Sequence, residues 1–216
     1  MTEPSAIWSF QLIVFDKSIS LTQNVILSHA RVALQAVIAR IDQLYKLIAT
    51  YPNMIEFYPH PDIPSILSDL CYQQGIASTI LFNDSRRGDK ESAAAYKLRL
   101  NRLEYVKEKC GSQTFPVLTS RKIRNSLTHI DEYLARELSR PKTGWMVDSA
   151  IGRRDQFTAA QHGISVAFCR TYISAEDKLL HFDNEISIKE LRAEAQAILT
   201  SIWPTTEAEE PPQPQS

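Results

Sequence analysis

The stretch from Ser18 to Thr50 contains neither glycine nor proline, and its apolar residues recur at helical spacings. These residues are Val25, Ile26, Leu34, Val37, Ile38, Ile41, Leu44, Tyr45 and Ile48. The spacing is that of one face of an α-helix. We therefore predict a long amphipathic helix, whose apolar face needs partners along most of its length.

Further helices are expected where the same period lies between helix-breaking residues. Four prolines after Thr50 separate the first helix from a second over Ser65–Phe82. A third is predicted over Glu91–Lys109, before a glycine at 111. Its apolar side is expected to carry Tyr96, Leu100, Leu103 and Val106. The apolar segment Ile7–Phe15 is expected to be a first helix or an extended lead-in packed on the core.

A fourth helix is predicted to begin at Thr119 or Ser120, either of which can cap it, and to continue to about Leu138. Its expected core-facing stripe is Ile123, Leu127, Ile130 and Leu134. Antiparallel helices joined by modest loops favour a helical bundle.

The hydrophobic period changes in the last third of the chain. Residues from Ile164 to Tyr172 alternate by two, which predicts a strand, and Lys178–Phe182 is its expected return partner after a turn. Ser187 and Glu190 form a capping-box pattern at the start of a last helix that ends before Pro204. The side of this helix expected to face the body carries Leu191, Ala195, Ile198, Leu199 and Ile202.

The predicted fold class is therefore mainly α. We expect an antiparallel helical bundle over residues 1–150 and a β-hairpin with a final helix, packed on the bundle, over residues 151–203. Residues 204–216 are rich in glutamate and proline and are expected to be a disordered tail.

Composition narrows the protein class. Apolar residues make up 44% of the chain, but no run of about eighteen of them occurs and no secretory leader pattern opens the sequence. We expect a cytoplasmic protein without a membrane segment. The three cysteines Cys71, Cys110 and Cys169 are widely spaced and are expected to be reduced structural thiols.

Charge is unevenly distributed along the chain. The formal net charge is −1, yet residues 86–154 hold sixteen Lys and Arg against eight Asp and Glu, a balance of +8. The remainder holds eight against seventeen, or −9. The central segment could form a surface that attracts phosphate. Helix faces that merely expose Lys and Arg to solvent are the equally weighted alternative.

The densest group of reactive side chains is Arg124-Asn125-Ser126-Leu127-Thr128-His129. Arginine binds phosphate through a planar cation, and histidine transfers protons near neutral pH. On a helix, Asn125 and His129 project from nearly the same side, with Arg124 about 100° around the axis from Asn125. Cleavage of RNA needs a base, an acid and a cation, because the 2′-hydroxyl is already the nucleophile.

This R-N-x-x-x-H pattern resembles the signature of the HEPN family, small helical domains that include many metal-independent ribonucleases. The resemblance implies a helical bundle, catalysis by Arg124, Asn125 and His129, and a homodimer whose shared cleft brings two copies of the histidine together. It also implies an RNA substrate, a role in defence or growth arrest, and a neutralising antitoxin protein. Family members controlled by tyrosine modification carry Tyr two residues after the histidine, where this chain has Asp131.

Weaker candidates surround the motif. Arg121 and Lys122, and also Arg153 and Arg154, could extend RNA binding or could be solvated surface charges. The other histidines have no second His or Cys at metal-ligand spacing, so neither a metal site nor a cofactor is expected. In the competing structural interpretation, His129 bonds to a neighbour at the edge of the bundle. The corresponding competing function is a non-catalytic helical binding or assembly module.

Overall fold

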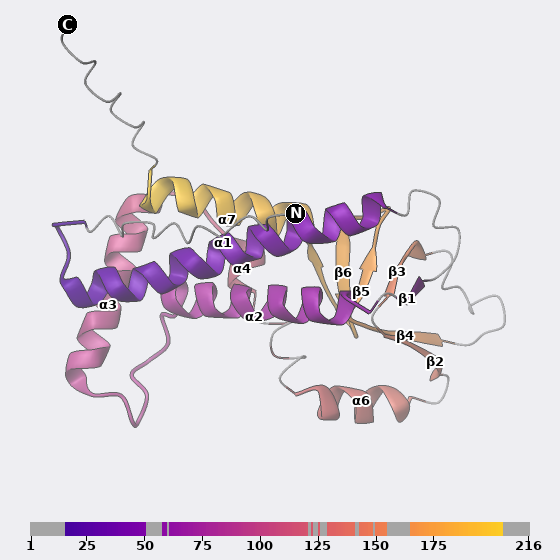
Figure 1. Ribbon diagram of the computed structural model, residues 1–216. Helices are drawn as coiled ribbons and strands as arrows, with labels where there is room; N and C mark the ends of the chain where they lie inside the picture. Colours follow the sequence, from indigo (N-terminus) through magenta and orange to yellow (C-terminus); the bar gives the residue numbers. More distant parts are fainter. Residues whose placement is uncertain are drawn as a thin grey trace, which may run out of the picture.

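The computed structural model describes most of the chain outside its two ends. The described residues are 16–50, 58–59, 61–120, 122, 125, 129–140, 143–148, 150–154 and 165–204. They form a mainly helical protein with a small mixed β region (Figure 1). The helices α1, α2 and α7 lie side by side, and the strands gather at one end of this helical part (Figure 1). The predicted elements in Ile7–Phe15 and in the tail lie outside the described residues.

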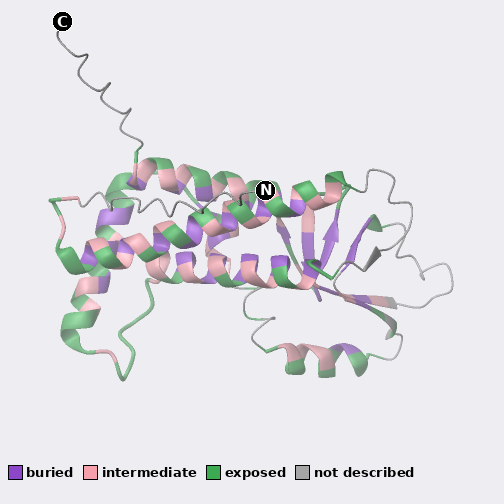
Figure 2. Cartoon of the chain, in the orientation of Figure 1, coloured by how far each residue is buried: buried purple, intermediate pink, exposed green. Residues whose placement is uncertain are grey.

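Helix α1, Leu21–Ala49, is the long amphipathic helix that the sequence predicts. Ser20 caps it: its side chain accepts a hydrogen bond from the Gln23 backbone N–H, and the Gln23 side chain accepts one from Ser20. Its buried face packs against α2, Ile63–Phe82, and α7, Ile188–Ile202. Figure 2 shows the buried residues as a stripe along the sides of these helices that face one another.

Helix α3, Ala93–Cys110, has only part of its predicted apolar side in the core: Val106 is buried, and Tyr96 and Leu103 are half-buried. Leu100 is exposed, whereas Arg99 and Arg102 are only 8% and 7% exposed. Both guanidinium groups are bound: Arg99 pairs with Glu91, and Arg102 Nε donates to the Ile80 carbonyl at 2.8 Å. A buried charge is tolerated when it is paired and hydrogen-bonded. These contacts tie α3 to the end of α2 and explain why both arginines are buried.

The described residues include two further helices, both short. Helix α4, Pro116–Thr119, lies against α2 and α7, and helix α6, Ile130–Leu138, lies apart from the bundle beside the strands (Figure 1). The last helix, α7, begins at the predicted cap, where the Ser187 hydroxyl accepts from the Glu190 backbone N–H at 3.2 Å.

The described strands form two sheets. The larger sheet has the order β1-β3-β5-β6-β7, and the smaller pairs β2 with β4 in parallel. Their bounds are Tyr58–Pro59, Thr143–Asp148, Ala150–Gly152, Ser165–Cys169, Thr171–Ile173, Lys178–His181 and Asn184–Ser187, for β1 to β7 in order. The antiparallel β5–β6 pair lies where a hairpin is predicted, and β6 and β7 form a second hairpin.

The single predicted strand over Ile164–Tyr172 is wrong. The extended backbone is interrupted at Arg170, whose φ of 45° is left-handed, and β4 and β5 therefore belong to different sheets. The Arg170 guanidinium pairs with Asp148 on β2, with Nε and Oδ1 2.9 Å apart. This ion pair holds the corner between the two sheets. A second, smaller core lies nearby and consists of Val147, Ala150, Ile173 and Leu180, with Val166 and Phe168 packed against it.

The buried face of α1 yields a direct stability test. Leu34 is fully buried, whereas Val32, two residues earlier, is 63% exposed. We expect Leu34→Ala to lower the free energy of unfolding by about 2–5 kcal/mol, because it leaves a cavity in the core. Val32→Ala, the matched control, should change it by less than about 0.5 kcal/mol. Chemical denaturation of both variants measures the difference, and equal losses would contradict this assignment of the α1 face.

Candidate functional site

The R-N-x-x-x-H motif lies in the segment between α4 and α6. Asn125 and His129 belong to the described residues and are exposed. The proposed phosphate-binding Arg124 lies outside the described residues, as does Arg121. The site is therefore built from Asn125, His129 and the elements that fix the segment at each end.

The predicted helix, capped by Thr119 or Ser120 and continuing to about Leu138, is confirmed only in part. Helix α4 ends at Thr119, Ser120 has the extended backbone of a cap with φ −63° and ψ 122°, and Lys122 and Asn125 are helical. The predicted continuity is wrong at His129, which leaves helical geometry with φ −111° and ψ 43°, and α6 begins after it. The predicted core-facing stripe is also weaker than expected, because Ile130 and Leu134 are only half-buried and the other two members lie outside the described residues.

Gln74 on α2 explains why the chain turns after α4. Its side chain is fully buried, and its Nε2 donates to the carbonyl oxygens of Val117, Leu118 and Ser120 at 3.0, 3.1 and 2.8 Å. In a continuing helix these oxygens would accept from backbone N–H groups four residues later. Gln74 takes their place and fixes Ser120, five residues before Asn125.

Glu194 on α7 holds the other end of α4. Its two carboxylate oxygens accept from the backbone N–H groups of Val117 and Leu118 at 3.1 and 2.7 Å. These N–H groups have no partner within so short a helix, so the carboxylate caps it. Burial raises the pKa of Glu194, while the two N–H bonds oppose that rise. Helix α4 is thus clamped between α2 and α7.

Backbone hydrogen bonds carry the helical register across His129 although its dihedral angles depart from the helix. The His129 N–H donates to the Asn125 carbonyl at 3.0 Å, and the Tyr133 N–H donates to the His129 carbonyl at 3.2 Å. Residues four apart lie on one side of a helix. Asn125, His129 and Tyr133 therefore follow one another along one side of this segment.

The His129 side chain is accessible. It is 56% exposed, and its Nδ1 lies 3.5 Å from Glu132 Oε1. A carboxylate at this ring nitrogen can orient the imidazole and stabilise its protonated form. In the alternative interpretation the same pair with Glu132 simply holds the histidine at the edge of the protein. The arrangement leaves an imidazole that can reach a substrate from solvent.

Helix α6 is attached to the β6–β7 hairpin. The Tyr133 ring stacks on Phe182 with centroids 5.5 Å apart, and the Arg136 guanidinium lies 4.4 Å from the Tyr133 ring centroid. Arg136 and Arg140 both bind Asp183, at 3.3 and 2.7 Å. Phe182 and Asp183 are the two residues of the turn, and Phe182 has a left-handed φ of 53°. The hairpin turn thus anchors the far side of the motif segment.

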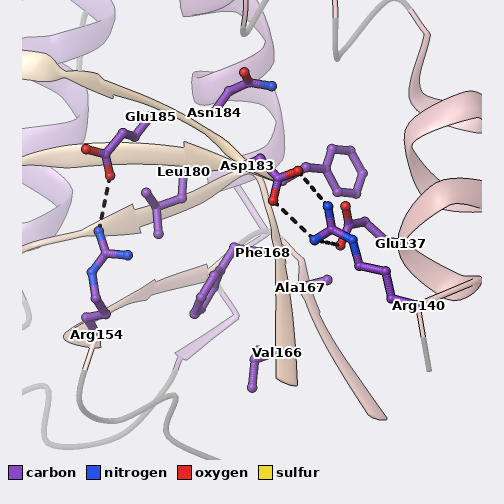
Figure 3. A pocket seen from close by; sticks show the side chains of 11 residues that line it. Glu137, Arg140, Arg154, Val166, Ala167, Phe168, Leu180, Asp183, Asn184 and Glu185 are labelled. Atoms are coloured by element: carbon purple, nitrogen blue, oxygen red, sulfur yellow. Dashed lines mark hydrogen bonds and ion pairs between the residues drawn. The ribbon is translucent and has the colours of Figure 1, made fainter. Parts of the chain in front are cut away.

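A pocket of about 260 Å³ lies between α6 and the strands (Figure 3). We call it the α6–sheet pocket, and its lining is Glu137, Arg140, Arg154, Val166, Ala167, Phe168, Leu180, Phe182, Asp183, Asn184 and Glu185. Figure 3 shows Arg140 bridging Glu137 and Asp183 on one side, and Arg154 paired with Glu185 on the other. Sequence reasoning missed this pocket, because its residues come from α6 and the residues just after it, from β4, from the β6–β7 hairpin and from Arg154, and they carry no local pattern.

The weaker RNA-binding candidates have different surroundings. Lys122 and Arg153 are exposed. Arg154 lines the α6–sheet pocket, but its guanidinium is bound by Glu176 at 2.7 Å and Glu185 at 3.3 Å. These ion pairs neutralise the charge of Arg154, and Arg99 and Arg102 are buried, so part of the positive charge of residues 86–154 is not exposed to solvent. The central basic segment is therefore less open to phosphate than its composition indicates.

The thiols and potential metal ligands form no reactive cluster within the described part of the chain. The three cysteines are free and buried, as predicted, and burial raises the pKa of the Cys71 thiol to about 12. Among the described residues, no three His, Cys, Asp or Glu side chains lie together as metal ligands would. None of the described helices is long and apolar enough to cross a membrane.

Comparisons with models of known protein families, with curated proteins and with solved structures found no match to this chain.

The Gln74 clamp leads to a prediction for the start of the motif segment. Gln74→Leu removes the donor from three carbonyl oxygens, so we expect the free energy of unfolding to fall by about 1–3 kcal/mol. The neighbouring Gln73 is only half-buried and binds Asp69 at 3.2 Å. Gln73→Leu should therefore cost less than about 1 kcal/mol. Denaturation of both variants tests which one loses more stability. A larger loss in Gln73→Leu than in Gln74→Leu would refute the role of Gln74 in holding the end of α4.

The attachment of α6 should depend on pH through Asp183. The bound Arg140 lowers the pKa of Asp183 from its ordinary value of 3.8. A lowered folded-state pKa stabilises the protein above the ordinary value, and this contribution is lost as pH falls through the folded-state pKa. We expect Asp183→Asn to cost about 0.5–1 kcal/mol at pH 7, since the pair is half exposed, and to cost less below about pH 4.

Thermal unfolding of wild type and Asp183→Asn from pH 7 to pH 3 measures this difference. Asp89→Asn, which changes an exposed loop carboxylate, is the control and should show no such pH-dependent gap. A gap for Asp183→Asn that grows as the pH falls would have the wrong sign for this mechanism.

Proposed function

We propose that this protein is a metal-independent endoribonuclease of HEPN type. The observation that carries the proposal is the exposed imidazole of His129, placed one helical turn after Asn125 and beside the Glu132 carboxylate. The R-N-x-x-x-H pattern supplies the third group, Arg124. The competing role for His129 is that of a structural residue at the edge of the bundle, bonded to a neighbour.

The reaction assigned to these groups is transesterification within RNA. The 2′-oxygen attacks phosphorus while a base accepts the 2′-hydroxyl proton, and the bond from phosphorus to the 5′-oxygen breaks as an acid protonates that oxygen. The products are a 2′,3′-cyclic phosphate and a 5′-hydroxyl. In this proposal His129 transfers protons, Arg124 stabilises the charged phosphorus centre, and Asn125 orients the imidazole or the phosphate.

The proposal includes a homodimer, because each chain offers one motif histidine whereas the reaction uses both a base and an acid. Two-fold symmetry would bring the His129 side chains of both copies to a shared cleft. The family resemblance adds the biological context: a cytoplasmic effector of defence or growth arrest, held in check by an antitoxin protein.

A non-catalytic assembly module is the second candidate. One observation favours it: Leu21, Val25 and Val32 expose apolar side chains on α1, by 68%, 44% and 63%. Positions 21, 25 and 32 fall on one side of the helix. Exposed apolar stripes of this kind commonly bind partners. Such a surface serves a binding module as well as it serves an enzyme that dimerises.

An RNA cleavage assay in excess chelator tests the proposed activity. We expect wild-type protein to cut single-stranded RNA to 2′,3′-cyclic phosphate ends and to leave all-deoxy substrate intact. His129→Ala and Arg124→Ala should each lower the rate by about a hundredfold or more, the usual scale for losing an acid–base group or a charge-stabilising group. His29→Ala, which removes another exposed histidine on α1, should cut at the wild-type rate. Unchanged cleavage by His129→Ala would refute the assignment, and absence of cleavage by wild type would favour the assembly module.

A further inference from the structure

Glu137 is a buried carboxylate that faces the α6–sheet pocket. The residue is 4% exposed, and its Oε2 lies 2.9 Å from Arg140 Nη1. Its Oε1 is buried and accepts no hydrogen bond from the described residues, although Arg136 Nε lies 3.6 Å away. A buried acceptor without a hydrogen bond costs free energy that a suitable donor would recover. Glu137 lines the pocket, so a ligand that enters it and displaces the atoms covering Oε1 would supply the missing hydrogen bond.

The remaining walls of the pocket favour a flat, uncharged group. Val166, Phe168, Leu180 and Phe182 supply apolar surface, including two aromatic rings. The charged lining consists of two arginines and three carboxylates, a sum of −1, and the arginines are already bound to those carboxylates or to Glu176. A phosphate would meet this net negative charge unfavourably. A planar group with N–H donors on one edge fits both the walls and the acceptor.

We propose that the α6–sheet pocket binds a guanine base of the RNA substrate, with Glu137 accepting hydrogen bonds from its Watson–Crick edge. This inference rests on the proposed ribonuclease function. Proteins that recognise single-stranded RNA stack splayed-out bases on aromatic side chains and bind their edges. The pocket volume of about 260 Å³ lies just below the range of about 300–1,000 Å³ typical of drug-sized ligands, as expected for a site that takes one base.

The hydrogen-bonding pattern of a carboxylate favours guanine over the other bases. An ionised carboxylate can only accept hydrogen bonds. Guanine places two donors, N1–H and the 2-amino group, next to each other on its Watson–Crick edge. Adenine and cytosine each place a ring-nitrogen acceptor beside their amino group, and uracil flanks its single N–H with two carbonyls. Only guanine meets the Glu137 oxygens with adjacent donors and no opposed acceptor.

The pocket lies at the opposite end of α6 from His129, which immediately precedes this helix. His129, Tyr133 and Glu137 are spaced four residues apart, and the Tyr133 N–H bonds to the His129 carbonyl, so the three residues follow one side of this segment. Eight residues span about 12 Å along a helix. Stacked nucleotides rise about 3.4 Å each, so this distance corresponds to about three or four stacked nucleotides, or fewer in an extended strand. The guanine is therefore expected at a fixed position within four nucleotides of the cut.

Cleavage mapping on a randomised single-stranded RNA tests the proposal. Wild-type protein should enrich guanine at one position near the cut. Replacing that guanine with inosine, which lacks the 2-amino group, or with 2-aminopurine, which lacks N1–H, should each slow cleavage by about tenfold. Glu137→Gln should keep cutting RNA but lose the preference for guanine. Glu108→Gln on the exposed side of α3 is the matched control and should retain the preference.

The substituted substrates need only wild-type protein, so they decide the question even if Glu137→Gln does not fold. Cleavage with no base enrichment, or equal rates on guanine, inosine and 2-aminopurine, would overturn the guanine site and leave the ribonuclease proposal standing. A binding assay tests the guanine site without relying on the proposed ribonuclease activity. Guanosine should bind the His129→Ala protein measurably more tightly than adenosine does, whether or not wild type cleaves RNA.

A guanidinium group also carries parallel N–H donors. An arginine side chain is therefore the alternative ligand that the experiment must distinguish from guanine. Binding of an arginine amide but not of guanosine would overturn the proposal and assign the pocket to the side chain of a protein partner. Binding of guanosine with at least tenfold weakening in Glu137→Gln, and no competition by arginine amide, is the result expected.

Discussion

The burial of one face of α1 is the interaction on which the rest of the molecule depends. Its fully buried side chains contact α2 on one side and α7 on the other, although these two helices are separated by about half of the sequence. Removing this apolar area from water stabilises both contacts at once. Because α2 carries Gln74 and α7 carries Glu194, the same packing brings together the two side chains that hold α4. The position at which the motif segment begins is therefore set by the core.

The motif segment is fixed at both ends by residues distant in sequence. At its start, Gln74 fixes the Ser120 carbonyl, and at its end the Phe182–Asp183 turn holds α6 through a ring contact and ion pairs. Neither attachment is made by the side chain of Asn125 or His129, and both residues are exposed. Supporting residues of this kind let reactive groups be exposed and still be positioned. The proposed acid–base chemistry needs this combination of access and order.

The sequence predicted those features of the fold that depend on the local pattern of residues. The amphipathic α1, the Ser187 cap of α7 and the buried cysteines all follow from spacing or composition. The side of α3 that faces the core was predicted only in part: Val106 is buried, but Arg99 and Arg102 are buried too, through partners on other segments. The interruption at His129 was missed for the same reason, since α6 is held by Phe182 and Asp183 on the distant β6–β7 turn. The α6–sheet pocket carries no sequence signal at all, because it exists only once the strands and α6 are assembled.

The backbone of Phe182 links stability to the proposed specificity. A phenylalanine with a left-handed φ of 53° is strained relative to glycine, which adopts this conformation without steric cost. A glycine at this turn would relax the backbone, but it would remove both the ring on which Tyr133 stacks and one wall of the α6–sheet pocket. The turn therefore keeps a residue that local folding preference disfavours. Selection for stability alone would be expected to push this position in one direction and selection for ligand binding in the other.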